Sequence, residues 1–378
     1  MSKVNRIYFF SFLSLIILLL VGSCTSNSHK AYLAEKPNVY QKNIANKKLL
    51  FVSNQDGDRE IFITNLNGEN LKQLTHNRRD DYDASWSPNS QFILFTSNRD
   101  NGDSEVYIMH ADGSQQTNLS RSPGYDGQPR WSPDGRTIAF TSDREGDIAI
   151  FSMGLDGADV RKLTTDNTAS MSYTEPVWSP NGQWIAYRKQ NERAKGDLWL
   201  VKLSNGQHRQ LTNNEKFDDD LPRWSPDSEK LTYITSNKEF KLTNLPSADS
   251  RPRWSHSGEE IVFISTRGST GRTQVFIMKK DGSDQQGLTD NRFQVNDAEW
   301  LDDDTGILYV SWQRGNVSNV FLADLKSGEH KVISPAKGYQ SQPLLEPAVF
   351  LTRSKKLPNH LPLLQNMTQK SHVAIVRQ

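Results

Sequence analysis

The stretch Gln128-Pro129-Arg130-Trp131-Ser132-Pro133-Asp134-Gly135 is the clearest copy of a unit that returns along the whole chain. Its tryptophan recurs at nearly even intervals, with one short interval before the fifth copy, at Trp86, Trp131, Trp178, Trp224, Trp254 and Trp300. A period in the forties is typical of a propeller blade, a unit that cannot bury its own apolar faces and packs against copies of itself. The repeat predicts a ring of similar blades.

Each repeat has the pattern of four short strands. Residues 128–131 form an extended run, and the Ser-Pro-Asp-Gly turn follows it. Residues 137–141 and 148–153 alternate as strands, and residues 161–164 give an outer strand. Helical periodicity is absent from the repeats. An all-β chain built of four-stranded antiparallel blades is therefore expected.

The two ends of the repeat region predict how the ring closes. The first repeat begins at residues 49–53 with its second strand and has no inner strand before it. Near the C-terminus, residues 342–347 repeat the inner-strand pattern with Leu345 in place of tryptophan. We expect the strand at Pro343 to Leu345 to complete the N-terminal blade and so remove a free sheet edge. This reasoning predicts seven blades.

One blade is shorter than the others. The interval from Trp224 to Leu242 is only a little over half of the equivalent interval from Trp178 to Leu211. About one strand is missing near residues 238–240, so a three-stranded blade is expected there. If this blade is squeezed out of the ring, six blades remain, and a six-bladed propeller is the alternative.

The N-terminus predicts export and lipidation. Residues 1–23 combine Lys3, Arg6 and the apolar run of residues 7–21, which is the pattern of a secretory signal. Val21-Gly22-Ser23-Cys24 resembles a bacterial lipobox, and Cys24 is the only cysteine of the chain. We expect a lipid on Cys24 and, because Thr25 follows it, a place on the periplasmic side of the outer membrane, or on the cell surface in a Gram-positive source.

The remaining boundaries follow from composition. Residues 24–47 are polar and are expected to form a tether, residues 48–353 the propeller, and residues 354–378 a tail in which residues 372–376 could add an edge strand. The formal net charge is only +1, which argues against nucleic acid as a partner. A mature chain with one cysteine forms no internal disulfide, so blade packing must stabilise it.

The repeats resemble those of the TolB propeller family. The resemblance rests on Leu-Thr, then Asp-x-x-Pro-x-Trp-Ser-Pro-Asp-Gly, Ile-x-Phe-x-Ser-x-Arg and Glu-Ile-Tyr-x-Met-x-x-Asp-Gly, most clearly at residues 102–113 and 127–141. It implies an envelope protein that binds a partner across one propeller face, as TolB binds the lipoprotein Pal. TolB has a further α/β domain before its propeller, whereas only a tether lies between Cys24 and the first strand here.

This resemblance predicts a non-enzymatic scaffold that binds an envelope protein or a peptidoglycan-associated partner. A Gly-x-Ser-x-Gly nucleophile elbow is absent, and no two histidines stand at metal-ligand spacing. The acidic turn at residues 54–60 suits a hairpin better than a calcium loop. We therefore expect no enzyme, no cofactor and no metal. A propeller-fold polysaccharide lyase or hydrolase is the alternative, and a divalent ion required for activity would distinguish it.

Charged residues of the inner strands form the candidate binding site, at the mouth of the ring. They flank the Pro or Ala of each inner strand, at Asp83, Gln128, Arg130, Glu175, Arg223, Arg251, Arg253, Asp297 and Glu299. Alternation along a strand places them opposite the tryptophan. Because buried charges need partners, they either form salt bridges between blades or bind a partner at the mouth.

Overall fold

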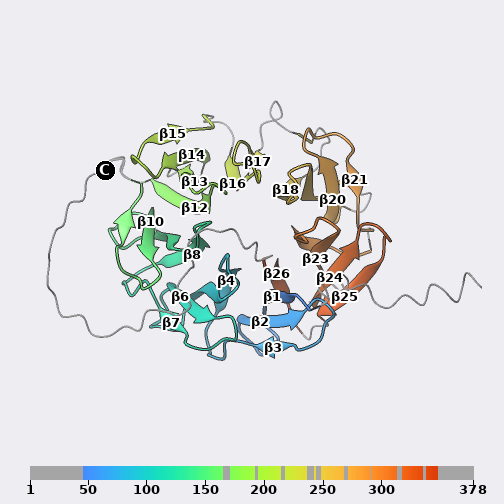
Figure 1. Ribbon diagram of the computed structural model, residues 1–378, viewed down its shortest axis with the longest axis horizontal. Coiled ribbons are helices and arrows are strands. Elements are labelled where there is room, and N and C mark those ends of the chain that lie inside the picture. Colours follow the sequence, from blue (N-terminus) through green and yellow to red (C-terminus); the bar gives the residue numbers. More distant parts are fainter. Residues whose placement is uncertain are drawn as a thin grey trace, which may run out of the picture. The chain divides into compact units, whose positions relative to one another are not determined.

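The computed structural model describes residues 46–347, apart from 165–170, 192–194, 214–217, 236–241, 244–247, 268–270, 291, 313–316 and 335–337. The described elements are all strands, arranged as seven antiparallel sheets around a ring (Figure 1). The all-β propeller predicted from the repeat is confirmed. No helix of the described residues is long and apolar enough to span a bilayer. The predicted signal, tether and tail lie outside these residues, and their boundaries stay predictions.

The strands have four places in the sheets. The inner strands are β4 (Asp81–Trp86), β8 (Asp126–Trp131), β12 (Ser172–Trp178), β16 (Asp219–Trp224), β18 (Asp249–Trp254), β22 (Val295–Trp300) and β26 (Gln340–Leu345). The second strands are β1 (Lys48–Ser53), β5 (Phe92–Ser97), β9 (Thr137–Ser142), β13 (Trp184–Gln190), β17 (Leu231–Thr235), β19 (Glu260–Ser265) and β23 (Gly306–Trp312).

The outer half of each blade adds two more strands. The third strands are β2 (Glu60–Asn65), β6 (Glu105–His110), β10 (Ala149–Gly154), β14 (Gly196–Lys202), β20 (Gln274–Lys279) and β24 (Ser318–Asp324). The outer strands are β3 (Lys72–Gln73), β7 (Thr117–Asn118), β11 (Arg161–Lys162), β15 (His208–Gln210), β21 (Gln286–Gly287) and β25 (His330–Ser334). Inner strands surround the centre of the ring in Figure 1, and β3, β7, β15 and β21 lie at its rim.

Closure of the ring follows the predicted scheme. Strand β26 pairs antiparallel with β1, with Leu345 opposite Leu49 and Gln340 opposite Ser53. The N-terminal blade therefore has the order β26-β1-β2-β3, with its first strand supplied from the far end of the chain. The predicted closing strand at Pro343 to Leu345 is confirmed and begins three residues earlier, at Gln340.

Six of the seven sheets are four-stranded blades, which agrees with the six-blade alternative, and the seven-blade ring is not confirmed. The remaining sheet contains only β16 and β17 among the described residues, at the place expected for the short blade. Only residues 236–241 separate Thr235 from Leu242, whereas residues 98–118 separate Ser97 from Leu119 in the β4–β7 blade. The shorter connection has too few residues for a turn, a strand and a second turn.

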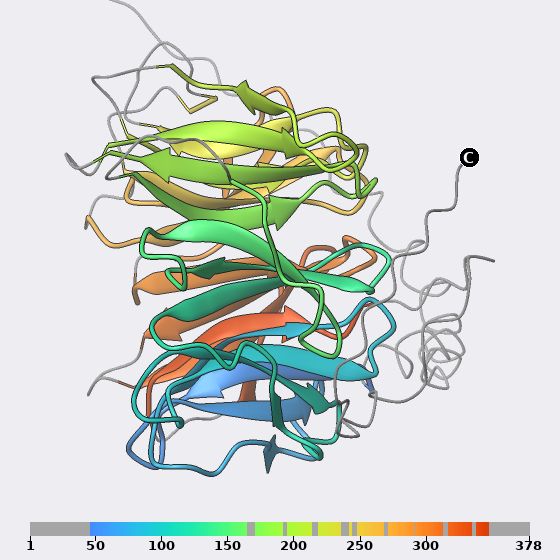
Figure 2. The same ribbon diagram turned by 90° about the vertical axis from the view of Figure 1, so that its left-hand side faces the viewer.

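The core lies between the faces of neighbouring blades. Second and third strands are buried on both faces, as in β5, where all six residues are buried. Side chains of adjacent blades interdigitate in clusters such as Ile138, Phe140, Ile150 and Phe151 with Val106 and Ile108. Figure 2 shows these blades from the side, stacked face to face. Each such side chain contributes roughly 1.5–3 kcal/mol on burial, so stacking stabilises the ring.

The repeat tryptophan links each inner strand to the previous blade. In five repeats its indole Nε1 donates a hydrogen bond of 3.1–3.3 Å to a backbone carbonyl of the preceding inner strand: Trp86 to Leu344, Trp131 to Ser85, Trp178 to Arg130, Trp224 to Val177 and Trp300 to Arg253. A buried indole needs such an acceptor. The interval of the repeat therefore reflects a contact made once per blade.

A repeated arginine ties the second strand to the inner strand of its own blade. Arg144 Nη2 lies 2.9 Å from Asp126 Oδ1, and its guanidinium lies 4.9 Å from the Phe140 ring centre and 5.4 Å from that of Phe151. Arg99 with Asp81 and Arg267 with Asp249 repeat the pairing. The arginine of the Ser-x-Arg motif is thus a structural cation held between a buried carboxylate and two aromatic rings.

Candidate functional site

Each inner strand is bent by a β-bulge at the residue before its Pro or Ala. The pairing register shifts at this point in β4, β8, β12, β16, β18 and β22. The bulge residue is left-handed, with φ between 51° and 59°, in Asp83, Gln128, Glu175, Leu221, Arg251 and Gln342. None of these is glycine, so the surrounding contacts must hold a conformation that costs about 1–3 kcal/mol.

Hydrogen bonds between successive bulges supply those contacts. Gln128 Oε1 accepts from the Glu175 backbone N–H at 3.0 Å, and Glu175 Oε2 accepts from the Leu221 N–H at 3.1 Å. Gln342 Oε1 accepts from the Asp83 N–H at 3.0 Å, while Gln342 Nε2 donates to Asp83 Oδ1 at 2.9 Å. These side chains therefore join neighbouring inner strands.

Two ion pairs extend the connection on the other side of the ring. Arg253 Nε lies 3.3 Å from Glu299 Oε2, and Arg251 Nη1 lies 3.4 Å from Asp297 Oδ2. Both pairs join β18 to β22, the inner strands of consecutive blades. Five of the predicted mouth residues, Asp83, Gln128, Glu175, Asp297 and Glu299, thus hold contacts between blades.

Three arginines remain as a positive group, which we call the arginine cluster: Arg130, Arg223 and Arg253. Each donates through Nη1 to the carbonyl of the proline before it, at 2.9, 2.8 and 3.3 Å. Burial and the nearby charges of Arg253 and Arg130 lower the pKa of Arg223 to about 9, so it stays charged at neutral pH. Arg130 on β8 and Arg223 on β16 interact although β12 lies between them, so their guanidinium groups converge on the centre.

Negative charge does not balance the arginine cluster. In the described part of the chain, Glu299 pairs with Arg253, while neither Arg130 nor Arg223 forms an ion pair. Guanidinium groups bind carboxylates through two parallel hydrogen bonds. Converging arginines without carboxylate partners are therefore suited to an anionic group.

Glu175 adds a pH-sensitive charge beside the arginine cluster. Burial, together with the neighbouring carboxylate of Asp220, raises the pKa of Glu175 to about 7. Ionised Glu175 partly neutralises Arg223, and protonated Glu175 does not. The positive charge of the site therefore rises as the pH falls through neutrality.

The sequence reasoning missed Tyr125, which borders the same site. Burial and the nearby Tyr82 and Asp83 raise the pKa of Tyr125, and Arg130 opposes this shift. A side chain at Gly127 would collide with the Tyr125 hydroxyl. Glycine at a position where the preceding blade has Tyr82 was the only sequence signal for this phenol.

The acidic turn at residues 54–60 brings Asp56, Asp58 and Glu60 together, with one oxygen of each within 4.8 Å of the others. Glu60 is fully buried, and burial beside Asp81 raises its pKa to about 8. Asp81 accepts from Arg99 and from Asn77, so Asp81 carries the charge and Glu60 the proton. These contacts join Glu60 to the framework of its blade.

Comparison with known proteins identifies the type of ring. Residues 99–241 match the TolB beta propeller domain family. The crystal structure of TolB from Acinetobacter baumannii superposes with a TM-score of 0.55 at 16% identity, over 82% of this chain and 70% of that one. The ring is a TolB-like β-propeller. The resemblance predicted from the repeat motifs is confirmed.

Peptidases are among the similar proteins as well. Over 156 residues the chain is 27% identical to the uncharacterized peptidase YuxL of Bacillus subtilis, which covers 39% of this chain and 19% of YuxL. A puromycin hydrolase mutant complexed with PGG superposes with a TM-score of 0.63 at 13% identity, over 80% of this chain and 53% of that one. The chain thus spans about a fifth of YuxL and about half of the hydrolase.

These relatives overturn one prediction. The absence of a Gly-x-Ser-x-Gly motif led to the expectation that the chain is not an enzyme, and the match to YuxL points instead to a peptidase-type propeller. The reasoning failed because it searched for a catalytic domain within the repeats. A propeller repeat carries no signal of the reaction in which it takes part.

Proposed function

We propose that the chain is a peptide-binding propeller of the peptidase type, whose arginine cluster holds an acidic segment of a peptide or protein. The observation that supports this most strongly is the convergence of Arg130, Arg223 and Arg253 with a carboxylate partner only for Arg253 among the described residues. Desolvated guanidinium groups that repel one another gain stabilisation from a bound anion. A peptide supplies carboxylates at acidic side chains.

Attachment to the cell envelope is part of the proposal. A lipid on Cys24 would hold the propeller on the periplasmic side of the outer membrane, where it meets envelope proteins and exported peptides. The lipobox-like Val21-Gly22-Ser23-Cys24 supports this placement. Cys24→Ser should leave an unlipidated precursor. Recovery of all wild-type protein without lipid in the soluble fraction would rule the placement out.

The peptide-binding proposal is tested by fluorescence anisotropy with a labelled glutamate-rich peptide and its glutamine counterpart. The glutamate peptide should bind at least 10-fold more tightly, and the difference should shrink with added salt, which screens charge. Arg223→Gln and Arg130→Gln should each weaken binding by about 10-fold, since a charge-assisted hydrogen bond contributes about 1.5–3 kcal/mol.

The matched control is Arg161→Gln, because Arg161 is an exposed arginine of the outer strand β11. It should bind like the wild type. Mass spectrometry of the same mixtures reports any cleavage of the peptide. Equal affinity for the glutamate and glutamine peptides would contradict the proposed site.

A further inference from the structure

The stack of blades is interrupted at the β16–β17 sheet. Buried apolar residues follow one another closely along the described chain up to Val201, and the next one is Ile261. Two grooves fill this interval. One, of about 440 Å³, lies between β17 and the β18–β21 blade, and the other, of about 380 Å³, lies toward the β12–β15 blade. Both are lined by Leu231 and Tyr233 of β17.

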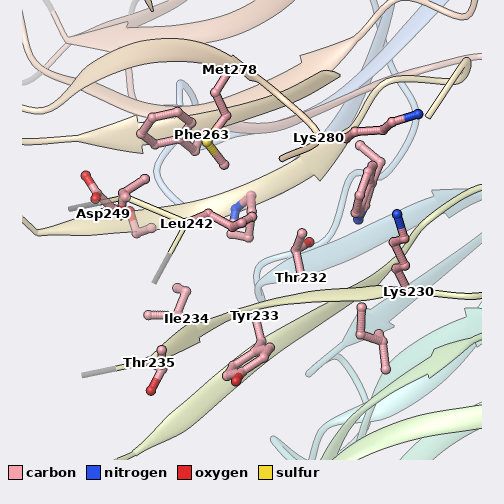
Figure 3. Close-up of a pocket in the computed structure, with 15 residues that line it drawn as sticks. Lys230, Thr232, Tyr233, Ile234, Thr235, Leu242, Asp249, Phe263, Met278 and Lys280 are labelled. Carbon is pink, nitrogen blue, oxygen red and sulfur yellow. The ribbon is translucent and has the colours of Figure 1, made fainter. Parts of the chain in front are cut away.

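The larger groove exposes side chains that are covered elsewhere in the ring. Figure 3 shows Phe263 and Met278 on one side of it, facing Tyr233 and Ile234 on the other. In the β4–β7 blade the equivalent positions, Phe95 and Met109, pack on Ile61 and Ile63 of the preceding third strand. The β16–β17 sheet has no third strand among the described residues, so nothing in that part of the chain fills this place.

The indole of Trp254 records the same defect. Its Nε1 is buried without a hydrogen-bond partner in the described structure, unlike the other five repeat tryptophans. The carbonyl expected to accept it belongs to Arg223, and Thr232 donates its hydroxyl to that oxygen at 3.4 Å. An unpaired buried N–H is costly, so the junction is incomplete.

We propose that residues 372–376 add to the free edge of β17 as the missing third strand. His372-Val373-Ala374-Ile375-Val376 repeats the third-strand pattern of Glu105-Val106-Tyr107-Ile108-Met109 in β6 and of Gln274-Val275-Phe276-Ile277-Met278 in β20. Edge strands with unpaired backbone groups accept such an added strand. This inference does not depend on the peptide-binding proposal.

The register follows from the complete blades. Trp224 pairs with Leu231 as Trp86 pairs with Ile93, and Leu94 pairs with Ile108 in the β4–β7 blade. By this equivalence Thr232 pairs with Ile375. The third-strand residues Val106 and Ile108 face the next blade, whose Phe140 and Phe151 they contact.

The same alternation assigns the side chains of the added strand to the two grooves. Val373 and Ile375 enter the larger groove beside Phe263 and Met278. Ala374 and Val376 enter the smaller groove, which Leu198 and Leu200 line from the other side. Apolar side chains of alternating direction thus match apolar grooves on both faces of the sheet.

The chain is long enough to reach this edge. The connection between Leu345, where β26 ends, and His372 spans at most about 90 Å when it is fully extended. A folded unit of about 300 residues has a radius of gyration of roughly 19 Å and is about 50 Å across. The segment therefore reaches β17 of its own molecule without strain.

Disulfide trapping in the full chain tests the proposal. In a Cys24→Ser background, Thr232→Cys with Ile375→Cys should cross-link within one molecule, because these residues face each other across the added strand pair. Thr232→Cys with Ala374→Cys is the matched control and should cross-link at least 10-fold less, since adjacent strand residues point to opposite faces. Equal yields, or links between two molecules, would overturn the proposal.

Hydrogen exchange provides a second measurement that does not need new cysteines. Ile375→Asp should speed exchange of the β17 amides at least 10-fold, while Asn366→Asp, outside the segment, should leave it unchanged. Exchange in β17 that is the same in the wild type and in Ile375→Asp would contradict the added strand.

Discussion

The ion pair between Arg253 and Glu299 allows a quantitative test of how the inner strands are held together. Its charged atoms are 3.3 Å apart, and the side chains are 20% and 24% exposed. At an effective dielectric constant of about 20, Coulomb attraction at that distance is about 5 kcal/mol. Desolvation offsets most of it, so a half-buried pair should couple by about 1–2 kcal/mol.

A double-mutant cycle with Arg253→Met and Glu299→Gln measures that coupling by urea unfolding. The neighbouring pair of Arg251 and Asp297 is the control, because Arg251 is 47% exposed and the pair should couple by less than about 1 kcal/mol. Glu299→Gln should also strengthen binding of the glutamate peptide, since it frees Arg253. For the first pair, a coupling no larger than that of two distant, independent sites would refute its role in the ring.

Three further predictions concern stability. Arg144→Met leaves the buried Asp126 without its cation and should cost about 3–5 kcal/mol in urea unfolding, whereas the exposed Arg136→Met should cost under about 0.5 kcal/mol. Deletion of residues 340–378 removes β26 and should abolish cooperative unfolding, so an unchanged melting transition would contradict the closure. Glu60 has a pKa of about 8 in the fold against 4.5 as a model group, so the folded state binds the extra proton and stability should fall as the pH rises from about 5 to 8; Glu60→Gln should flatten that profile, and a slope like that of the wild type would exclude Glu60 as its source.

The architecture was predictable because the blade contacts recur once per repeat. The tryptophan interval corresponds to the indole hydrogen bond between blades, and Leu345 in a tryptophan-like position correctly identified the closing strand. The number of blades was harder to predict. Spacing alone reveals that the repeat after Trp224 is short, but whether its remaining strands stay in the ring depends on packing against both neighbours.

The site was only partly predictable for a similar reason. Strand alternation placed Arg130, Arg223 and Arg253 on equivalent positions, and the structure brings their guanidinium groups together. The left-handed bulge at Gln128 was missed, because residues before proline normally favour extended conformations. That bulge turns the Gln128 side chain toward the backbone of the next blade, so bulge residues link the strands while the residues after proline line the centre.

The central claim, that the arginine cluster binds an anionic peptide segment, is tested most directly by the affinity for the glutamate peptide as a function of pH. Protonation of Glu175 removes a negative charge near Arg223, so wild-type affinity should rise as the pH falls from 8 to 6. Glu175→Gln should bind tightly at both values, and Arg223→Gln should bind weakly at both. A wild-type affinity that is independent of pH and unchanged by Arg223→Gln would contradict the account.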